Sequence, residues 1–265
     1  MSSKVPKVAF VDVRTEDVLA GLDADQQRVA TSFGAPVVVI AGAGTGKTRA
    51  MTHRIAYGAA SGVYRPQSVL ALTFTTRAAG ELRTRLRALG LPSVQARTFH
   101  SAALRQAQFF WPRAYGSQLP PVSDERAGMV AAAARKVRLA PDSGQLRDLL
   151  TEVSWAKVSN VAPAEYASLA LTIGREVAGV AASDVGKVLG AYERVKAERG
   201  VIDFDDILLC AVAMLGENGD IAEEVRATYH HLLVDEYQDV SPIQQTLLDL
   251  WWSADGDNCV VGDPA

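Results

Sequence analysis

A glycine-rich octapeptide between an apolar run and a helical pattern constrains the fold of this chain more than any other feature. The preceding residues 36–40 are typical of a buried strand, and residues 49–55 after it have the periodicity of a helix. The octapeptide itself is Ala41-Gly42-Ala43-Gly44-Thr45-Gly46-Lys47-Thr48. A strand, a glycine-rich turn and a helix N-terminus form a cradle for phosphate, because the N–H groups of the loop and the positive end of the helix dipole meet the anion.

Two side chains at the end of the octapeptide have the chemistry that a bound nucleoside triphosphate requires. Lys47 can reach the β- and γ-phosphates, and Thr48 can hold Mg²⁺ through its hydroxyl. The strict consensus has glycine at position 41, where this chain has alanine. An ordinary glycine-rich turn is the alternative interpretation. The strand–loop–helix context favours a site for ATP and Mg²⁺.

A second candidate site lies near the end of the chain, where the acidic pair Asp235-Glu236 follows the apolar residues 232–234. In open α/β sheets the functional groups lie just beyond the carboxyl ends of the strands, so this pair can share a site with the phosphate loop. Asp235 would then hold Mg²⁺, and Glu236 would act as general base on the attacking water. A solvated acidic turn is the alternative, but Gln238 and Asp239 complete a longer motif, Asp-Glu-Tyr-Gln-Asp.

The apolar runs along the chain predict an α/β fold with a parallel sheet. Four of them are continuous, as expected for strands buried on both faces, and lie at residues 37–40, 69–74, 231–236 and 259–263. Helical patterns alternate with the first of these strands, which favours a parallel sheet covered on both faces. A further helix is expected from about residue 101 to 110, with its end at Trp111-Pro112.

The character of the sequence changes between residues 112 and 199, where alanine dominates and β-branched runs disappear. This change predicts an all-helical insertion in the sheet domain. We expect an N-terminal extension at 1–20, a sheet domain formed by 21–110 and 200–265, and an inserted helical subdomain at 111–199.

Charge is distributed unevenly along the chain. The formal net charge is -3, so any contact with nucleic acid must come from a local patch. Six arginines lie from Arg77 to Arg105 against a single acid, Glu81, and Phe74 and Phe99 lie close to them in sequence. Basic segments with interspersed aromatic residues are typical of single-stranded DNA binding. The alternatives are a solvated helix face for the arginines and core packing for either phenylalanine.

The octapeptide and the motif at residues 235–239 together resemble the UvrD/PcrA/Rep group of superfamily 1 DNA helicases. The phosphate loop of that group usually begins with alanine, which accounts for Ala41. The resemblance covers nearly the whole chain from Leu22 onward. It implies a RecA-like P-loop NTPase domain with a parallel sheet, interrupted by an all-helical subdomain.

The resemblance also implies which residues surround a bound ATP. Residues 22–26 are similar to the Q motif of the family, whose glutamine contacts adenine, and Arg49 matches an arginine that packs on the adenine ring. Gln238 corresponds to a residue that links the nucleotide state to a partner domain. The implied nucleotide site consists of Gln26, Ala41, Gly42, Ala43, Gly44, Thr45, Gly46, Lys47, Thr48 and Arg49, with Thr48 and Asp235 on Mg²⁺ and with Lys47, Asp235, Glu236 and Gln238 as catalytic residues.

Other segments resemble the parts of the family that contact DNA. Residues 72–79 resemble the motif that lines the single-strand path, although Thr76-Arg77 stand where the family more often has Asn-Lys. Residues 98–101 resemble the next DNA-contacting motif, and residues 202–208 resemble the segment that returns from the helical insertion. The implied DNA contacts are Phe74, Thr75, Arg77, Thr98, Phe99 and His100.

We therefore expect the parent protein to be an ATP-dependent DNA helicase or translocase of 3′→5′ polarity. It would act in DNA repair on single-stranded DNA and on junctions between single- and double-stranded DNA. The second RecA-like domain of the family is expected beyond Ala265, so this piece alone is not expected to unwind DNA.

Two alternatives stay open: a helicase subunit of a RecB-like helicase–nuclease, and a non-motor P-loop module that binds DNA or a partner.

No apolar run is long enough to span a membrane, and the two cysteines lack metal-ligand spacing. We therefore expect a cytoplasmic protein with no membrane partner.

Overall fold

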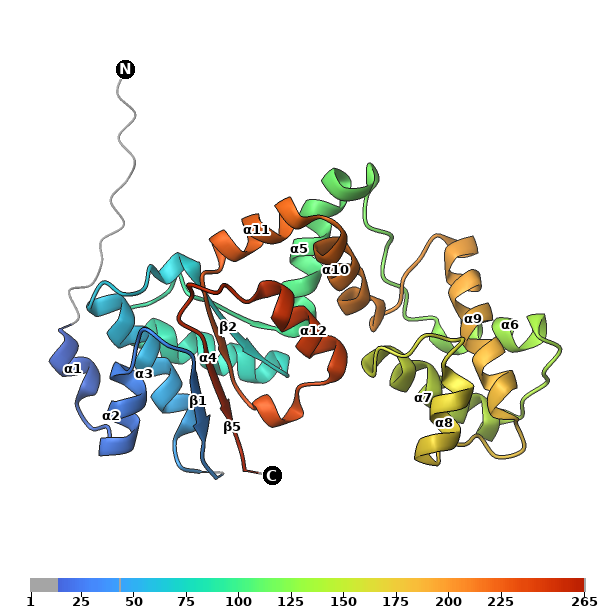
Figure 1. Ribbon diagram of the computed structural model, residues 1–265, viewed down its shortest axis with the longest axis horizontal. Helices are drawn as coiled ribbons and strands as arrows, with labels where there is room; N and C mark the ends of the chain where they lie inside the picture. The colour runs from blue at the N-terminus through green and yellow to red at the C-terminus, as the bar shows by residue number, and fades with distance from the viewer. Residues whose placement is uncertain (1–13, 43, 265) are drawn as a thin grey trace, which may run out of the picture. The chain divides into compact units, whose positions relative to one another are not determined.

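A five-stranded sheet, parallel throughout, organises the parts of the chain that carry both predicted motifs (Figure 1). The computed structural model describes residues 14–42 and 44–264. In the order in which they pair, the strands are β1 (Val37–Ile40), β5 (Cys259–Gly262), β4 (His231–Val234), β2 (Val69–Thr73) and β3 (Gln95–Thr98). The predicted α/β fold with a parallel sheet is confirmed.

Burial explains why the inner strands are apolar without interruption. Every residue of β2, β4 and β5 is buried, as expected for strands that are covered on both faces. Strand β1 lies at the edge of the sheet, and its Val38 and Ile40 are 67% and 68% exposed. The register pairs Ile40 with Gly262, so the phosphate loop begins beside the end of β5.

Four helices accompany the sheet in the described part of the chain, and three of them contribute buried side chains to one apolar core with its strands. They are α1 (Thr15–Leu19), α2 (Ala24–Thr31), α3 (Lys47–Ala60) and α4 (Thr76–Ala88), with short 3-10 turns η1 (Pro66–Ser68) and η2 (Tyr237–Asp239). Met51 of α3 and Leu82 of α4 belong to the same buried cluster as Leu233 of β4. Val18 of α1, within the extension expected at 1–20, also joins this cluster, whereas residues 1–13 lie outside the described part of the chain.

The chain divides into two compact units. The first contains the sheet and, within the described residues, runs to Phe99, then takes Ala222–Val240 and continues from Trp251; the second takes His100–Ile221 and Ser241–Leu250. The limits of these two units differ from the limits expected for the inserted helical subdomain, residues 111 and 199. The expected domain limits stay a prediction.

The second unit is built from helices. Its helices, three of which extend into the first unit, are α5 (Phe99–Tyr115), α6 (Arg126–Lys136), α7 (Ser143–Val158), α8 (Tyr166–Ile173), α9 (Ala182–Arg199), α10 (Asp206–Glu217), α11 (Gly219–Thr228) and α12 (Pro242–Trp251). Apolar residues of α6 to α9, such as Met129, Val153 and Leu189, form its core. The predicted all-helical interruption of the sheet, between β3 and β4, is confirmed. Within residues 14–42 and 44–264, no helix is both long and apolar enough to cross a membrane.

Helix α5 is longer than the sequence predicts. Pro112 lies inside it, so the predicted helix end at Trp111-Pro112 is wrong. A proline lacks the N–H donor of its own position, but its C=O still accepts. Here the carbonyl of Pro112 accepts from the N–H of Gly116 at 3.0 Å, and the helix closes one turn later.

A buried polar cluster ties α3 to the segment before β5. Arg54 Nη2 donates to both carboxylate oxygens of Asp257 at 2.8 Å, and the hydroxyl of Tyr64 donates to the same carboxylate. The N–H of Asp257 in turn donates to Nδ1 of His231 at 3.2 Å. Burial, and then the charge of the neighbouring His230, lower the pKa of His231 to about 4.

Acidification is expected to destabilise the first unit through His231. Its pKa in the folded chain lies below the unfolded value near 6.5, so its contribution is intact above that pH and is lost as the pH falls towards 4. Linkage gives a loss of about 2 kcal/mol in the free energy of unfolding between pH 7 and pH 5. His231→Asn keeps an acceptor for the Asp257 N–H but does not titrate, so denaturant unfolding at the two pH values should show a smaller loss. Equal losses in both proteins would contradict this assignment.

Candidate functional site

The phosphate loop connects β1 to α3 through glycines in the left-handed region. Gly44 has φ +80° and Gly46, the N-cap of α3, has φ +85°. A Cβ at Gly46 would also lie 2.6 Å from Nε2 of Gln26, so a larger residue would be strained by its φ and would displace the end of the Gln26 side chain. The N–H of Ala41 donates to the carbonyl of Gly262 at 3.1 Å and so anchors the loop to β5. The positive φ angles of these glycines and the contact with β5 thus shape the backbone of the loop.

Of the remaining loop residues that the sequence predicts as nucleotide contacts, Thr45 makes a contact within the loop. The hydroxyl of Thr45 donates to the carbonyl of Gly42 at 2.8 Å, across the turn. Ala43, which is predicted to line the nucleotide site, lies outside the described residues.

Lys47 is the first residue of α3, and it is buried. Its Nζ donates to the carbonyl of Ala41 at 3.0 Å and forms an ion pair with Asp263, which directly follows β5. A buried ammonium needs such partners because the loss of hydration is costly. The pairing with Asp263 was not foreseen from the sequence, since it depends on β5 being the neighbour of β1.

Thr48 and Asp235 lie side by side although 187 positions separate them in sequence. The hydroxyl of Thr48 donates to Oδ2 of Asp235 at 2.9 Å. The N–H of Asp235 donates to the carbonyl of Leu72 at 2.9 Å, which fixes the residue at the end of the sheet. Burial raises the pKa of Asp235, and the hydrogen bond from Thr48 opposes that rise. The structure thus brings the two predicted metal-binding residues together.

This pair of oxygens fits Mg²⁺. Magnesium is usually held by one or two protein oxygens, with water and substrate phosphates as the other ligands. No group of three or more His, Cys, Asp or Glu side chains within residues 14–42 and 44–264 could hold a metal ion. A magnesium ion at Thr48 and Asp235 would therefore depend on phosphate oxygens for part of its coordination.

Glu236 and Gln238 connect the acidic motif to the end of β5. Glu236 has φ +55°, which is unusual for a residue with a side chain and is found mostly where function requires it. Gln238 Nε2 donates to Oε2 of Glu236 at 2.9 Å, and its Oε1 accepts from the N–H of Asp263 at 2.9 Å. Because Asp263 also pairs with Lys47, one chain of contacts joins the predicted base to the phosphate loop.

Gln26 and Arg49 border the loop on its α2 side. Gln26 forms a capping box with Asp23, and its Nε2 also donates to the carbonyl of Thr45 at 3.0 Å. A cavity of about 690 Å³ lies between α2 and β1 and is lined by Gln26, Val38, Ile40 and the loop. Its volume is typical of small-molecule sites. Arg49 is exposed one turn into α3, and its guanidinium lies near Gly21.

The predicted DNA contacts of the first unit differ in exposure. Thr75 caps α4 by accepting from the N–H of Ala78 at 3.1 Å, and both Thr75 and Arg77 are exposed. Phe74 and Thr98 are half-buried. Phe99 is fully buried, with Phe74 at 5.6 Å and Trp251 at 6.4 Å between ring centroids. In this arrangement the ring of Phe99 packs in the core against Phe74 and Trp251.

In the second unit, the imidazole of His100 is stacked on an aromatic ring that the sequence prediction did not select. The rings of His100 and Phe204 lie 4.2 Å apart with an interplanar angle of 15°, and Phe204 is 51% exposed. Burial lowers the pKa of His100, and the charge of Asp205 opposes this. The sequence contains a pattern that could have singled out Phe204 as a candidate, because it is the single aromatic residue among three carboxylates at positions 203–206.

Comparison with known proteins supports a common origin for these features. The family model for the UvrD/REP helicase N-terminal domain matches residues 22–265. ATP-dependent DNA helicase UvrD2 of Mycobacterium tuberculosis is 42% identical over 265 residues, which cover 96% of this chain and 38% of that protein. ATP-dependent DNA helicase UvrD1 of Mycobacterium leprae is 32% identical over 270 residues (95% of this chain, 34% of that protein). ATP-dependent DNA helicase PcrA of Bacillus subtilis is 28% identical over 254 residues (94% and 33%). The chain thus spans little more than a third of the curated relatives it matches.

Proposed function

The chain belongs to the UvrD/REP helicase N-terminal domain family, and from this premise we propose that the whole protein is an ATP-dependent DNA helicase or translocase. The family resemblance favours 3′→5′ movement along single-stranded DNA and a role in DNA repair, with junctions between single- and double-stranded DNA as substrates. The observation that carries the proposal is the convergence of Thr48 and Asp235 beside Lys47. Its cofactors are ATP and Mg²⁺.

In the proposed mechanism the loop and Lys47 bind the triphosphate. The loop N–H groups and the N-terminus of α3 face the phosphates, and Lys47 exchanges its contacts with Ala41 and Asp263 for the β- and γ-phosphates. Gln26 and Arg49 hold the adenine end. Magnesium, when bound at Thr48 and Asp235, would neutralise the charge on the phosphate oxygens.

Glu236 is proposed to orient the attacking water and to accept its proton. Gln238 donates through its Nε2 to the carboxylate of Glu236. Its Oε1 accepts from the N–H of Asp263, which directly follows β5. A displacement of Asp263 when Lys47 moves to phosphate would therefore reach Gln238 and Glu236 through direct contacts. This gives Gln238 a physical route by which it could couple nucleotide state to a partner domain.

DNA binding is proposed to use the exposed and half-exposed residues of the two units. Phe74, Thr75, Arg77 and Thr98 supply ring, hydroxyl and guanidinium groups from the first unit, and His100 with Phe204 supplies a stacked aromatic pair from the second. Stacking on aromatic side chains tolerates any base, which suits a protein that moves along DNA of any sequence. We leave Phe99 out of the direct contacts because of its burial.

The chain of 265 residues is expected to hydrolyse ATP slowly and not to unwind DNA by itself. The family's second RecA-like domain supplies arginines across the nucleotide, and an arginine of this kind contributes about 10³–10⁵ in rate. Steady-state ATPase and strand-displacement assays, with and without single-stranded DNA, should compare residues 1–265 with the full-length protein. Robust unwinding by the short chain would show that the site needs no partner domain.

Substitution of Gly46 by alanine is expected to weaken ATP binding at least about tenfold. The methyl group would strain a backbone conformation that disfavours side chains and would displace the end of Gln26, which is proposed to contact the adenine. Gly62→Ala is the matched control, since Gly62 has a similar φ of +79° but no neighbour within 4 Å. Calorimetric titration with a non-hydrolysable ATP analogue should find weaker binding only for Gly46→Ala. Equal affinities in the two variants would contradict the proposed cradle.

A further inference from the structure

The segment that leads into α10 has an inverted polarity. Asp203 and Asp206 are buried and Asp205 is half-buried, whereas the one aromatic residue among them, Phe204, is exposed. Apolar side chains are usually the buried ones, and carboxylates are rarely buried unless they are paired. The inward carboxylates therefore need partners, and the outward ring needs an explanation.

The partners of Asp203 and Asp206 come from two other helices of the second unit. Lys157 Nζ of α7 donates to Asp203 Oδ2 and to Asp206 Oδ1, both at 2.6 Å. The hydroxyl of Tyr192 donates to Asp203 Oδ2 at 2.7 Å, and Lys196 Nζ donates to Asp206. We call Lys157, Lys196, Asp203 and Asp206 the buried charge cluster. Burial alone would raise the pKa of Asp203, but the positive charge of Lys157 lowers that pKa to about 2.

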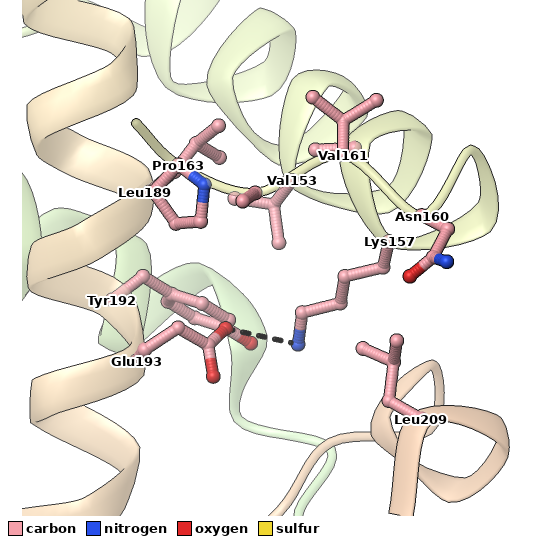
Figure 2. Close-up of a pocket in the computed structure, with 11 residues that line it drawn as sticks. Val153, Lys157, Asn160, Val161, Pro163, Leu189, Tyr192, Glu193 and Leu209 are labelled. Carbon is pink, nitrogen blue, oxygen red and sulfur yellow. Dashed lines mark ion pairs between the residues drawn. The ribbon is translucent and has the colours of Figure 1, made fainter. Parts of the chain in front are cut away.

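Figure 2 shows the surroundings of Lys157, whose side chain extends from α7 towards Tyr192 and Glu193 of α9. A cavity of about 250 Å³ lies beside it and is lined largely by apolar residues, among them Leu189 and Leu209. Glu193 lines this cavity and pairs with Lys157 at 3.4 Å, so it supplies part of the compensating charge, and Asp203 and Asp206 supply the rest at 2.6 Å. The cavity also leaves room for an uncharged side chain of similar length.

The cluster also fixes the backbone on both sides of Phe204. The N–H of Asp203 donates to Asp206 Oδ2 at 2.7 Å, and the N–H of Asp206 donates to Asp203 Oδ1 at 2.9 Å. Arg126 of α6 pairs with Asp205 at 2.9 Å and donates to Ser154 at 2.7 Å. Phe204 thus lies in a four-residue turn whose other three side chains are all anchored to the helical core.

Buried ion pairs are weak evidence for stability, because the cost of desolvation can exceed the attraction. In some proteins buried ionic groups instead serve to select one geometry. Here the selected geometry holds the ring of Phe204 flat against His100 and leaves half of the ring exposed.

We propose that the buried charge cluster positions Phe204 against His100 as a stacking platform for a base of single-stranded DNA. Lys157 and Lys196 are then positioning residues that act on DNA binding through Phe204 without touching DNA. This inference rests on the proposed function, since it requires that the whole protein binds single-stranded DNA. It extends that function to residues in the interior of the helical unit.

A double-mutant cycle in the full-length protein tests the inference, with the Kd for fluorescein-labelled oligo(dT) as the readout. Phe204→Ala is expected to weaken binding about tenfold, as expected for the loss of one stacked base. Lys157→Met should weaken it about fivefold or more in the wild-type background, but should have no further effect in the Phe204→Ala background. Lys157→Arg, which keeps the charge, should restore most of the affinity. Lys187→Met removes an exposed lysine of α9 that pairs with Asp184 and should leave Kd unchanged.

The outcomes separate the two claims. If Phe204→Ala leaves Kd unchanged, the stacking role in the proposed function fails, and the inference fails with it. If Phe204→Ala weakens binding but Lys157→Met has no effect, or has the same effect in both backgrounds, stacking stands and positioning is wrong. Folding of each variant is checked by circular dichroism. If Lys157→Met does not fold, the same double-mutant cycle is measured with Lys196→Met and Phe204→Ala, so the test remains.

Discussion

Lys47→Ala in the full-length protein is expected to reduce the DNA-stimulated ATPase rate by at least about 10²–10³-fold. Lys47 is the buried cation at the start of α3, and in the proposed mechanism it meets the charge that develops on the transferred phosphate. Loss of one preorganised electrostatic group in an active site typically has an effect of this size. The alanine variant also leaves Asp263 without its cation, so nucleotide affinity should fall as well.

The measurement for Lys47→Ala is a steady-state ATPase assay at saturating oligo(dT), with nucleotide affinity determined separately. Lys187→Ala, which removes a lysine that is largely exposed, is the matched control and should behave as wild type. Retention of more than a tenth of the wild-type rate by Lys47→Ala would exclude the proposed role of this side chain.

Glu236→Gln is expected to separate ATP binding from hydrolysis. The substitution preserves shape, and the new amide oxygen can still accept from Gln238 Nε2, so the contacts of the motif survive. The amide cannot accept the proton of the attacking water, and loss of a general base typically costs about 10²–10⁴-fold in rate. ATP affinity should change little, because in the proposed mechanism the loop and Lys47 bind the phosphates and Glu236 acts on the attacking water.

The two quantities are measured by single-turnover hydrolysis and by calorimetric titration with ATP. Asp255→Asn, which neutralises an exposed acid in the loop before β5, controls for the change in net charge. Unchanged hydrolysis in Glu236→Gln would require a different general base. A parallel loss of affinity and rate would indicate that Glu236 is structural.

Local sequence patterns carry the information from which the nucleotide side of the site is predicted. The strand, the glycine-rich turn and the helix start are contiguous, and their chemistry is set by residue types at fixed spacing. The placement of Asp235 follows from a general property of parallel sheets, whose carboxyl ends share one edge. The distance between Thr48 and Asp235 bears out that expectation.

Other features required the tertiary structure. The pairing of Lys47 with Asp263 depends on the strand order, which periodicity does not contain. Core packing of Phe99 is one of the two interpretations that the sequence allows. An aromatic residue after a strand gives the same sequence pattern whether its ring contacts DNA or is buried, and here the ring is buried. Pro112 suggested a helix end because its cost in a helix is real, yet in α5 only one further turn follows it. The sequence assigns residues 202–208 only to the segment that returns from the helical insertion, and the burial of Asp203 and Asp206 beside the exposed ring of Phe204 required the tertiary structure.

The most direct test of the central claim is a crystal structure of the full-length protein with a non-hydrolysable ATP analogue and Mn²⁺, which replaces Mg²⁺ and gives an anomalous signal. We predict one strong anomalous peak between Thr48 and Asp235, with the γ-phosphate beside Lys47 and within reach of a water held by Glu236. A triphosphate bound elsewhere, or a metal ion that contacts neither Thr48 nor Asp235 directly or through water, would contradict the account.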